Sequence, residues 1–275
     1  MARFVLITGC SSGIGLAAAR GLQAHGFSVI ASARNEEDVK QLQSYGLEAI
    51  QLDVRNTDSI RRGVDAALQI AGGRLYALFN NAGYGQPGAI EDLPTDALRE
   101  QLETNLIGVH QLTRLVLPGM LAAGEGRIIQ NSSVLGLVAM KFRGAYNTSK
   151  FALEGYTDTL RLELRGTGVH VSLIEPGPID THFRANARNA FLKHINPEAS
   201  RHHESYRQTL TRLEKEGLSG RFTLPAEACL PPLLHALSSS KPKARYQVTF
   251  PSKLFYILRR LLPTGLLDAL ASKSA

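Results

Sequence analysis

A tyrosine and a lysine near the middle of the chain have the types and the spacing needed for proton transfer. Tyr146 and Lys150 are four residues apart in a segment predicted to be helical, so their side chains share one face. Free tyrosine has a pKa of about 10, and a nearby ammonium group favours the phenolate and lowers that pKa. Ser132 and Ser133, at the end of a predicted strand, each offer a hydroxyl that can hydrogen-bond a substrate oxygen. These side chains indicate general acid–base chemistry.

A glycine cluster near the amino terminus is suited to binding a phosphate group. Gly9, Gly13 and Gly15 stand in the run T-G-C-S-S-G-I-G of residues 8–15, between an apolar strand and a helix. Glycine lets the backbone approach a phosphate closely, and the free N–H groups of a helix N-terminus point toward it. The spacing differs from the G-x-G-x-x-G fingerprint, because three residues separate the first two glycines. An ordinary tight turn is the alternative, but the position at the first strand–helix turn favours a nucleotide site.

Strands and helices that alternate along the first 180 residues are expected to position these groups. Short apolar runs predict strands and the longer segments between them predict helices, an order typical of βαβ units and a parallel sheet. Right-handed crossovers favour a doubly wound, Rossmann-type α/β fold of about seven strands with helices on both faces. The predicted strands are residues 3–8, 27–32, 48–52, 75–80, 127–132, 169–174 and 245–249, and the predicted helices are residues 13–25, 36–44, 57–71, 96–123, 145–164 and 226–239.

We predict a single dinucleotide-binding domain over residues 1–275, because the chain contains no repeat and no low-complexity linker. Residues 184–225 interrupt the alternation, since they are polar, rich in Arg and His, and contain no clear strand. We interpret them as an insertion. Residues 251–275 form an apolar and basic extension, in which Pro263 and Gly265 predict two short helices instead of one.

Six ordered motifs carry a resemblance to a known family. They are T-G-C-S-S-G-I-G at 8–15, N-N-A-G at 80–83, Asn105, Ser133, Y-N-T-S-K at 146–150 and P-G-P-I-D-T at 176–181. In this order they resemble the short-chain dehydrogenase/reductase family over about residues 3–182. The run Y-N-T-S-K-F-A-L-E-G of residues 146–155 is similar to its NADP-dependent branch of 17β-hydroxysteroid and retinol dehydrogenases. The resemblance implies an oxidoreductase that transfers a hydride between NADP(H) and the carbonyl or alcohol carbon of a hydrophobic aldehyde, ketone or alcohol.

The resemblance also implies a catalytic set of four residues. Tyr146 protonates the substrate oxygen during reduction, and Lys150 tunes that tyrosine. Ser133 binds the oxygen and is preferred to Ser132, because the family's serine stands about 13 residues before its tyrosine and residue 133 has that separation. Asn105 resembles the residue that fixes a water molecule linking the lysine to solvent.

The expected cofactor is NADP. In this family a carboxylate at the end of the second strand would bind the ribose 2′-hydroxyl of NAD, but Ala33 stands there and Arg34 follows it. A guanidinium group suits a phosphate, although Arg34 as an ordinary surface residue is the alternative. The full set expected to bind the cofactor is Gly9, Ser11, Ser12, Gly13, Ile14, Gly15, Arg34, Asp53 and Val54 at the adenine, Asn81, Ala82, Gly83, Tyr146, Lys150, and Ile179 and Thr181 at the nicotinamide amide.

The family binds its substrates with the insertion before the seventh strand, which here is residues 184–225. Apolar residues at and within the insertion, and after Ser133, are expected to form a pocket for a hydrophobic carbonyl compound; packing of the lid itself is the alternative. Steroid, retinoid and aliphatic substrates all stay open. These apolar residues are Phe183, Phe191, Ile195, Tyr206, Leu210, Leu135, Val138, Met140 and Phe142.

The net charge of +7 is concentrated in the last third of the chain. Residues 1–180 carry 16 Lys and Arg against 18 Asp and Glu, whereas residues 181–275 carry 15 against 6. A basic face suits nucleic acid, an anionic membrane, or plain solvation. We expect no nucleic-acid partner, because no known binding motif is present. Residues 251–275 have three possible destinations: their own subunit, a second subunit of a homodimer or homotetramer, or peripheral contact with a membrane.

Several other classes are disfavoured by the sequence. A non-catalytic NADP-sensing protein on the same fold would usually lose the tyrosine or the lysine, and both are present.

The two cysteines, Cys10 and Cys229, imply no disulfide framework. The histidines form no metal motif, and the adjacent pair His202 and His203 is expected to be solvated. No signal peptide and no spanning helix is visible, so a cytoplasmic location is expected.

Overall fold

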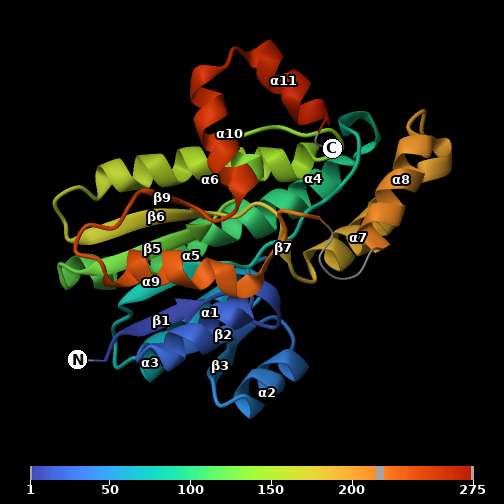
Figure 1. The fold of residues 1–275 in the computed structure, drawn as a ribbon. Coiled ribbons are helices and arrows are strands. Elements are labelled where there is room, and N and C mark those ends of the chain that lie inside the picture. Colours follow the sequence, from blue (N-terminus) through green and yellow to red (C-terminus); the bar gives the residue numbers. More distant parts are fainter. Residues whose placement is uncertain (1, 215–219, 274–275) are drawn as a thin grey trace.

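The computed structural model, which describes residues 2–214 and 220–273, contains the predicted parallel sheet. Its seven strands run in the order β3-β2-β1-β4-β5-β6-β9, and every neighbouring pair is parallel (Figure 1). The order reverses between β1 and β4, where doubly wound sheets bind ligands at their carboxyl ends. The strands are β1 Phe4–Ile7, β2 Ser28–Ala33, β3 Glu48–Gln51, β4 Ala77–Asn80, β5 Gly126–Asn131, β6 Val169–Glu175 and β9 Arg245–Gln247.

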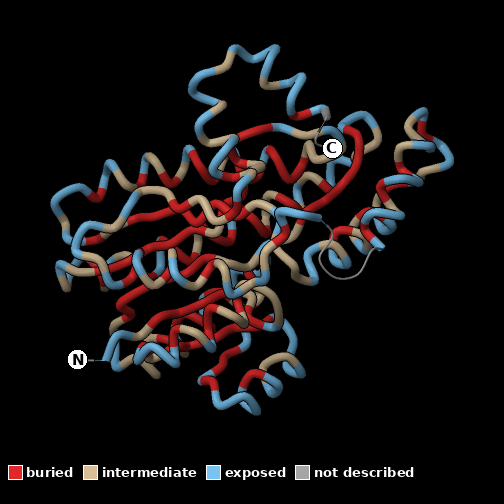
Figure 2. The backbone as a smooth tube through the Cα atoms, viewed as in Figure 1, coloured by how far each residue is buried: buried red, intermediate tan, exposed pale blue. Residues whose placement is uncertain are grey.

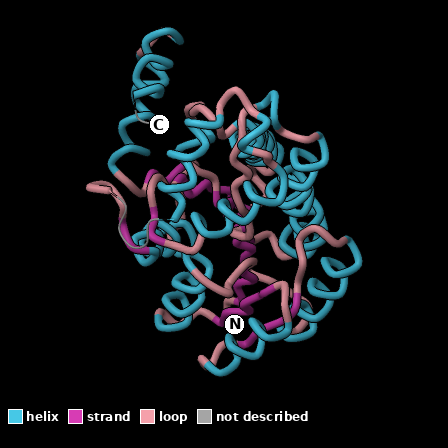
Figure 3. The backbone as a smooth tube through the Cα atoms, turned by 90° about the vertical axis from the view of Figure 1, so that its right-hand side faces the viewer, coloured by secondary structure: helices cyan, strands magenta, loops and turns pink. Residues whose placement is uncertain are grey.

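Helices cover both faces of the sheet because successive side chains of each strand enter two different apolar cores. Val5 and Ile7 of β1 face one core, and Leu6 between them faces the other. Figure 3 shows the strands as a central layer between the helices, and Figure 2 shows them buried. The first core is covered by α1 Gly13–Ala24, α2 Glu36–Ser44 and α9 Leu230–Ser238, and the second by α3 Thr57–Ile70, α5 Gly108–Ala122 and α6 Gly144–Glu163.

The helix predicted over residues 96–123 is not a regular α-helix. Helix α4 Thr95–Leu102 passes into α5 through a π-helical turn, Glu103–Ile107. A π turn closes its hydrogen bonds one residue later than an α-helix and is frequent at functional sites. A Cβ atom on Gly108 would clash with the carbonyl oxygen of Val54, so the helix passes very close to the chain that follows β3.

The insertion predicted over residues 184–225 contains two helices and a short strand. They are α7 Phe183–His194, α8 His203–Glu214 and β8 Leu224–Pro225, and β8 pairs with β7 Ile179–Asp180. We expected no clear strand in this segment, and β8 corrects that expectation. A strand of two residues is too short to show an alternating pattern in the sequence. Residues 215–219 lie outside the described residues.

The expected solvation of His202 is also wrong. Its Nε2 lies 2.8 Å from Glu91 Oε1, and its ring meets the ring of Phe142 edge-on with centroids 5.2 Å apart. Its neighbour His203 is exposed, as expected. Adjacent residues at a helix start point in different directions, so one can pack while the other is solvated.

The extension over residues 251–275 forms the two predicted helices, α10 Phe250–Leu261 and α11 Thr264–Lys273, which project from the rim of the molecule (Figure 1). One side of α10 packs on its own subunit, where Ser252 Oγ donates to the Glu175 carbonyl oxygen at 2.6 Å. Arg259 Nη1 donates to the Gly136 carbonyl oxygen at 3.3 Å. The opposite side exposes large apolar residues, Phe250, Leu254, Ile257 and Leu261, followed by Leu266 and Leu270 of α11. Within the described ranges, no helix has the length and apolarity to cross a membrane.

Candidate active site

A cavity of about 580 Å³ opens at the carboxyl ends of the strands. Its walls come from the segments that follow β1, β2, β3 and β4, because parallel strands end at the same edge of the sheet. Gly15, Tyr146, Lys150 and Ile179 are not among its walls. The other residues expected to bind the cofactor all line it: Gly9, Ser11, Ser12, Gly13, Ile14, Arg34, Asp53, Val54, Asn81, Ala82, Gly83 and Thr181.

The glycine turn has the shape required for a phosphate. Gly9 and Gly13 have φ angles of 70° and 56°, a backbone region that favours glycine. A Cβ on Gly9 would lie 2.9 Å from the Cα of Ala82, and a Cβ on Gly15 would clash with the carbonyl oxygen of Gly9. The N-cap residue Ser12 makes no side-chain capping bond, so the first N–H groups of α1 are available to an anion. These residues fit a dinucleotide.

Thr8, which begins the motif of residues 8–15 but was not predicted as a site residue, fixes the second wall of the cavity. Its Oγ1 accepts hydrogen bonds from the backbone N–H groups of Asn81 and Ala82, both at 3.0 Å. Asn81 Nδ2 in turn donates to the carbonyl oxygens of Thr8 at 2.9 Å and Gly9 at 3.1 Å. The glycine turn and the N-N-A-G segment are therefore held as one unit.

Tyr146 and Ser133 meet beside the cavity. Both are 8% exposed, and the Ser133 hydroxyl is near enough to Tyr146 to lower its pKa. The ring of Tyr146 also meets that of Phe183, a cavity wall, edge-on at 5.4 Å between centroids. Ser132 points elsewhere, because its Oγ donates to Glu154 Oε1 at 2.5 Å. Of the two serines, Ser133 is thus the one that faces the tyrosine.

The expected lowering of the Tyr146 pKa is wrong for this structure. Burial raises the pKa of Tyr146 to about 12 and outweighs the Ser133 hydrogen bond and the positive charge of Arg143, which both lower it. Lys150 Nζ lies 5.7 Å from the centre of the tyrosine ring and donates to the Asn131 carbonyl oxygen at 2.6 Å. Burial also lowers the pKa of Lys150 to about 8. Desolvation is therefore the largest cause of the pKa shift of both Tyr146 and Lys150.

Asn105 and Asn131 link the candidate residues to the cavity wall. Asn105 Nδ2 donates to Ser149 Oγ at 3.1 Å and to the Tyr84 carbonyl oxygen at 3.0 Å, while its Oδ1 accepts from the Tyr84 N–H. Asn131, which the sequence analysis missed, donates to Asn81 Oδ1 at 2.9 Å. A polar path thus runs from Lys150 through Asn131 and Asn81 to the glycine turn. Its only sequence signal is that Asn131 stands next to the end of the strand predicted over residues 127–132.

The remaining predicted cofactor residues lie around the rim of the cavity. Ala33, at the end of β2, is 2% exposed, whereas Arg34 is exposed and lines the cavity. Asp38 of α2 lines it as well and was not predicted. Asp53 Oδ1 accepts the N–H of Arg55 at 3.0 Å, which orients its carboxylate.

The segment expected to bind the nicotinamide amide, which carries Ile179 and Thr181, touches the glycine turn. A Cβ on Gly13 would lie 2.9 Å from the methyl carbon of Thr181, and Ile179 is half-buried in β7.

Among the residues the structure describes, no group of three or more His, Cys, Asp or Glu could hold a metal ion.

A doubly wound sheet with a glycine cradle at its carboxyl edge defines a dinucleotide-binding protein of the Rossmann class. The family profile described as short chain dehydrogenase matches residues 3–191, and the chain belongs to that family of oxidoreductases.

Relatives and solved structures agree with this assignment. The chain is 41% identical to an uncharacterized oxidoreductase, YbbO, of Escherichia coli K12, over 98% of this chain and 93% of the relative. It is 37% identical to human 17-beta-hydroxysteroid dehydrogenase type 6, over 99% and 88%, and 34% identical to mouse retinol dehydrogenase 16, over 98% and 87%. These matches support the hydroxysteroid and retinol dehydrogenase-like branch. A Burkholderia phymatum short chain dehydrogenase/reductase in complex with NAD superposes with a TM-score of 0.79 at 28% identity, covering 94% and 92%.

Proposed function

We propose that this oxidoreductase transfers a hydride between NADP(H) and the carbonyl or alcohol carbon of a hydrophobic aldehyde, ketone or alcohol. The observation that carries the proposal is the meeting of Tyr146, Ser133 and Lys150 beside the glycine-lined cavity. When bound, the cofactor supplies or accepts the hydride. The chain's own residues bind the substrate oxygen and move its proton.

Each candidate residue has a distinct part in the proton transfer. The Tyr146 hydroxyl donates a proton to the substrate oxygen during reduction and takes it back during oxidation. Ser133 donates a hydrogen bond to the same oxygen. Lys150 stabilises the phenolate by its charge, and Asn105 supports a proton path from Lys150 toward solvent. A non-catalytic NADP sensor is not favoured, because Tyr146 and Lys150 are both present.

The preference for NADP over NAD is proposed from the rim of the cavity. Arg34 offers a guanidinium group to a 2′-phosphate, and Ala33 offers no carboxylate to a ribose hydroxyl. Asp38 in the same wall carries a negative charge that would repel a phosphate. A comparison of KM for NADPH and for NADH therefore tests the preference.

The substrate is proposed to be hydrophobic and to lie beneath the lid of residues 184–225. Phe183 presents its ring to Tyr146 and is 38% exposed, so it can contact a bound molecule. Phe191 and Tyr206, also expected in the pocket, are 0% exposed and pack with Ile195 in a small core inside the lid. They support the lid without offering surface to a substrate. The names of the hydroxysteroid and retinol dehydrogenase relatives agree with an apolar substrate.

A spectrophotometric screen tests the proposal. NADPH oxidation is followed with aldehydes and ketones of graded chain length. We expect kcat/KM to rise about fourfold per methylene group while the chain fits the pocket. A flat response contradicts a hydrophobic pocket, and no oxidation of NADPH or NADH with any compound contradicts the function.

Four further expectations stay predictions. They are assembly into a homodimer or homotetramer, membrane contact, cytoplasmic location and a single domain over residues 1–275.

A further inference from the structure

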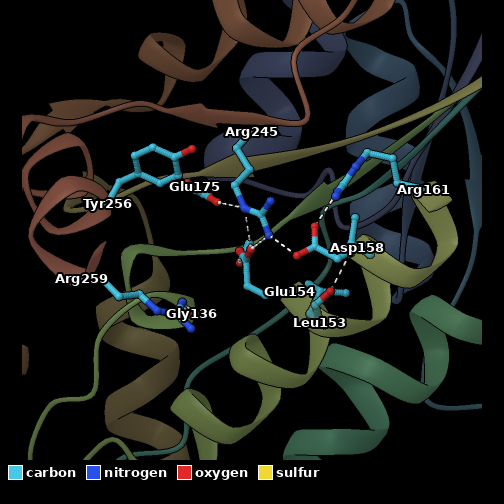
Figure 4. A network of polar contacts seen from close by, with 12 residues as sticks. Gly136, Leu153, Glu154, Asp158, Arg161, Glu175, Arg245, Tyr256 and Arg259 are labelled. Carbon is cyan, nitrogen blue, oxygen red and sulfur yellow. Dashed lines mark hydrogen bonds and ion pairs between the residues drawn. The ribbon is translucent and has the colours of Figure 1, made fainter. Parts of the chain in front are cut away.

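A cluster of charged side chains lies behind the turn that carries Ser133. Arg245 of β9 contacts three carboxylates, two from α6 and one from β6 (Figure 4). Its Nη2 lies 3.1 Å from Glu154 Oε2 and 2.7 Å from Asp158 Oδ2, and its Nε lies 3.1 Å from Glu175 Oε1. Glu154 is 5% exposed and Glu175 is 0% exposed. Burial raises the pKa of Glu154, whereas its contacts with Arg245 and Ser132 lower that pKa and so favour the ionised carboxylate.

Glu154 reaches the active site first through Ser132. Its Oε1 accepts the hydrogen bond of Ser132 Oγ, and Ser132 is the residue before Ser133. A Cβ on Gly136 would lie 2.9 Å from Ser132 Oγ and 3.0 Å from Glu154 Cγ. The 3₁₀ turn Val134–Gly136, which begins at Ser133, therefore rests directly on the pair. A shift of the Glu154 carboxylate would therefore displace Ser132 and the turn that begins at Ser133.

Glu154 also reaches the site through its charge. It stands one helical turn after Lys150 on α6, and its carboxylate raises the pKa of Lys150 while burial lowers it. The groups around Lys150 are Tyr146 of the same helix and the Asn131 carbonyl oxygen of β5.

The surroundings of Glu154 hold further charges from every neighbouring element. They are Arg245 of β9, Glu175 of β6, Asp158 of α6 and, beyond Asp158, Arg161, while Arg260 of α10 acts on Glu175. Among the residues that the structure describes, Glu154 is the acidic side chain whose charge raises the pKa of Lys150.

We propose that Glu154 is a positioning residue of this active site, which holds the Ser133 turn in place through Ser132 and places a carboxylate one helical turn after Lys150. The inference rests on the proposed function for the roles of Ser133 and Lys150. Glu154 itself is not among the residues that line the cavity.

Two variants separate the two routes. Glu154→Gln keeps an oxygen that Ser132 can donate to but removes the charge, whereas Ser132→Ala removes the hydrogen bond and keeps the charge. We expect Glu154→Gln to lower the Lys150 pKa by about 0.5 or more, and the alkaline fall of kcat to move by the same amount. We expect Ser132→Ala to reduce kcat about tenfold with no movement of that fall and no change of KM for the cofactor.

The Lys150 pKa is measured directly by NMR titration of protein labelled with ¹³C-lysine, with the signal assigned through Lys150→Arg. The matched control is Asp158→Asn, which removes a carboxylate of the same Arg245 from the same helix but touches neither Ser132 nor Gly136. We expect Asp158→Asn to leave the Lys150 pKa unchanged and kcat within about twofold.

An unchanged Lys150 pKa in Glu154→Gln overturns the proposal, as does an unchanged kcat in Ser132→Ala or an equal shift in Asp158→Asn. If Glu154→Gln does not fold, judged by circular dichroism, the kcat of Ser132→Ala decides alone. The NMR titration needs no turnover, so it still tests Glu154 if the chain reduces no carbonyl compound and the proposed function itself fails.

Discussion

The hydroxyl of Tyr146 lies beside Ser133 in a nearly closed, desolvated position, and burial raises its pKa to about 12. A buried phenol holds its proton, which suits donation to a carbonyl oxygen but makes the return step dependent on positive charge nearby. Arg143 lowers the Tyr146 pKa by its charge, and Lys150 Nζ lies 5.7 Å from the centre of the tyrosine ring.

We expect Tyr146→Phe to reduce kcat to less than a tenth, because the change removes only the transferable proton. Binding of NADPH should stay within about twofold, since the ring and its packing against Phe183 are kept. Steady-state kinetics and fluorescence titration of NADPH measure the two quantities. Retention of a tenth or more of the wild-type kcat would contradict the role of Tyr146.

Arg34 is expected to carry the preference for NADP(H). Losing a charged contact to the 2′-phosphate in Arg34→Ala should cost about 1.5–3 kcal/mol, or about 10- to 150-fold in KM for NADPH. KM for NADH should hardly change. Ala33→Asp should favour NADH, because a carboxylate there repels the phosphate and accepts the ribose hydroxyl. Equal KM values for both cofactors in the unmutated chain would rule out the preference.

Sequence spacing predicted the residues that belong to short motifs and missed those that act alone. Tyr146 and Lys150 share one helix turn, and the glycines share one turn, so both sets carry a local pattern. Arg245 is 91 residues away from Glu154, and no spacing connects the two. Spacing favoured Ser133 over Ser132 as the catalytic serine, and the structure adds a reason, because Ser132 binds Glu154 instead.

At the scale of elements, the Arg245 cluster joins the last strand to the strand and helix beside it. Glu175 of β6 also accepts from Gln247 of β9 at 2.6 Å, so two polar side chains of β9 converge on one buried carboxyl group. Burial and the negative charge of Glu154 raise the pKa of Glu175 to about 7. The folded chain therefore binds this proton more tightly than the unfolded chain.

The free energy of unfolding should accordingly contain a part that decreases as the pH rises from about 4.5 to about 7, since protons bound preferentially by the native state are lost over that range. Glu175→Gln should remove a dependence on the order of 2 kcal/mol. Urea unfolding at pH 5 and pH 7.5 measures it, with the exposed Glu163→Gln as control. The same pH dependence in Glu175→Gln and wild type would show that Glu175 is not the group.

The strands and most helices were predictable because their apolar periodicity is local. The π turn at Glu103–Ile107 was not, since it accompanies a close approach of Gly108 to Val54 that no periodicity records. Helix α8 was hidden by its polar composition and is recognisable only through Tyr206, which packs against Phe191 in the lid core.

At the scale of the whole molecule, the helices α10 and α11 have one packed side and one exposed apolar side. Deleting residues 251–275 should lower Tm by about 5 °C, because it removes the bonds of Ser252 and Arg259 to the rest of the chain. Differential scanning calorimetry measures this.

The same deletion separates the three destinations predicted for this segment. Light scattering would detect a smaller assembly if the helices form a subunit interface. Lost binding to anionic vesicles, with activity retained, would indicate membrane contact. An unchanged Tm, size and vesicle binding would contradict all three.

The bond between Arg259 and Gly136 has a consequence for the order in which the protein becomes functional during synthesis. Ribosomes make chains from the amino terminus, so the glycine turn, Tyr146 and Lys150 leave the exit tunnel well before Arg245 and Arg259. Arg259 donates directly to the Gly136 carbonyl oxygen, and Arg245 pairs with Glu154, which accepts the hydrogen bond of Ser132. A nascent chain can thus form its glycine turn early, whereas the segment from Ser132 to Gly136 gains these contacts only after Arg245 and Arg259 have been translated.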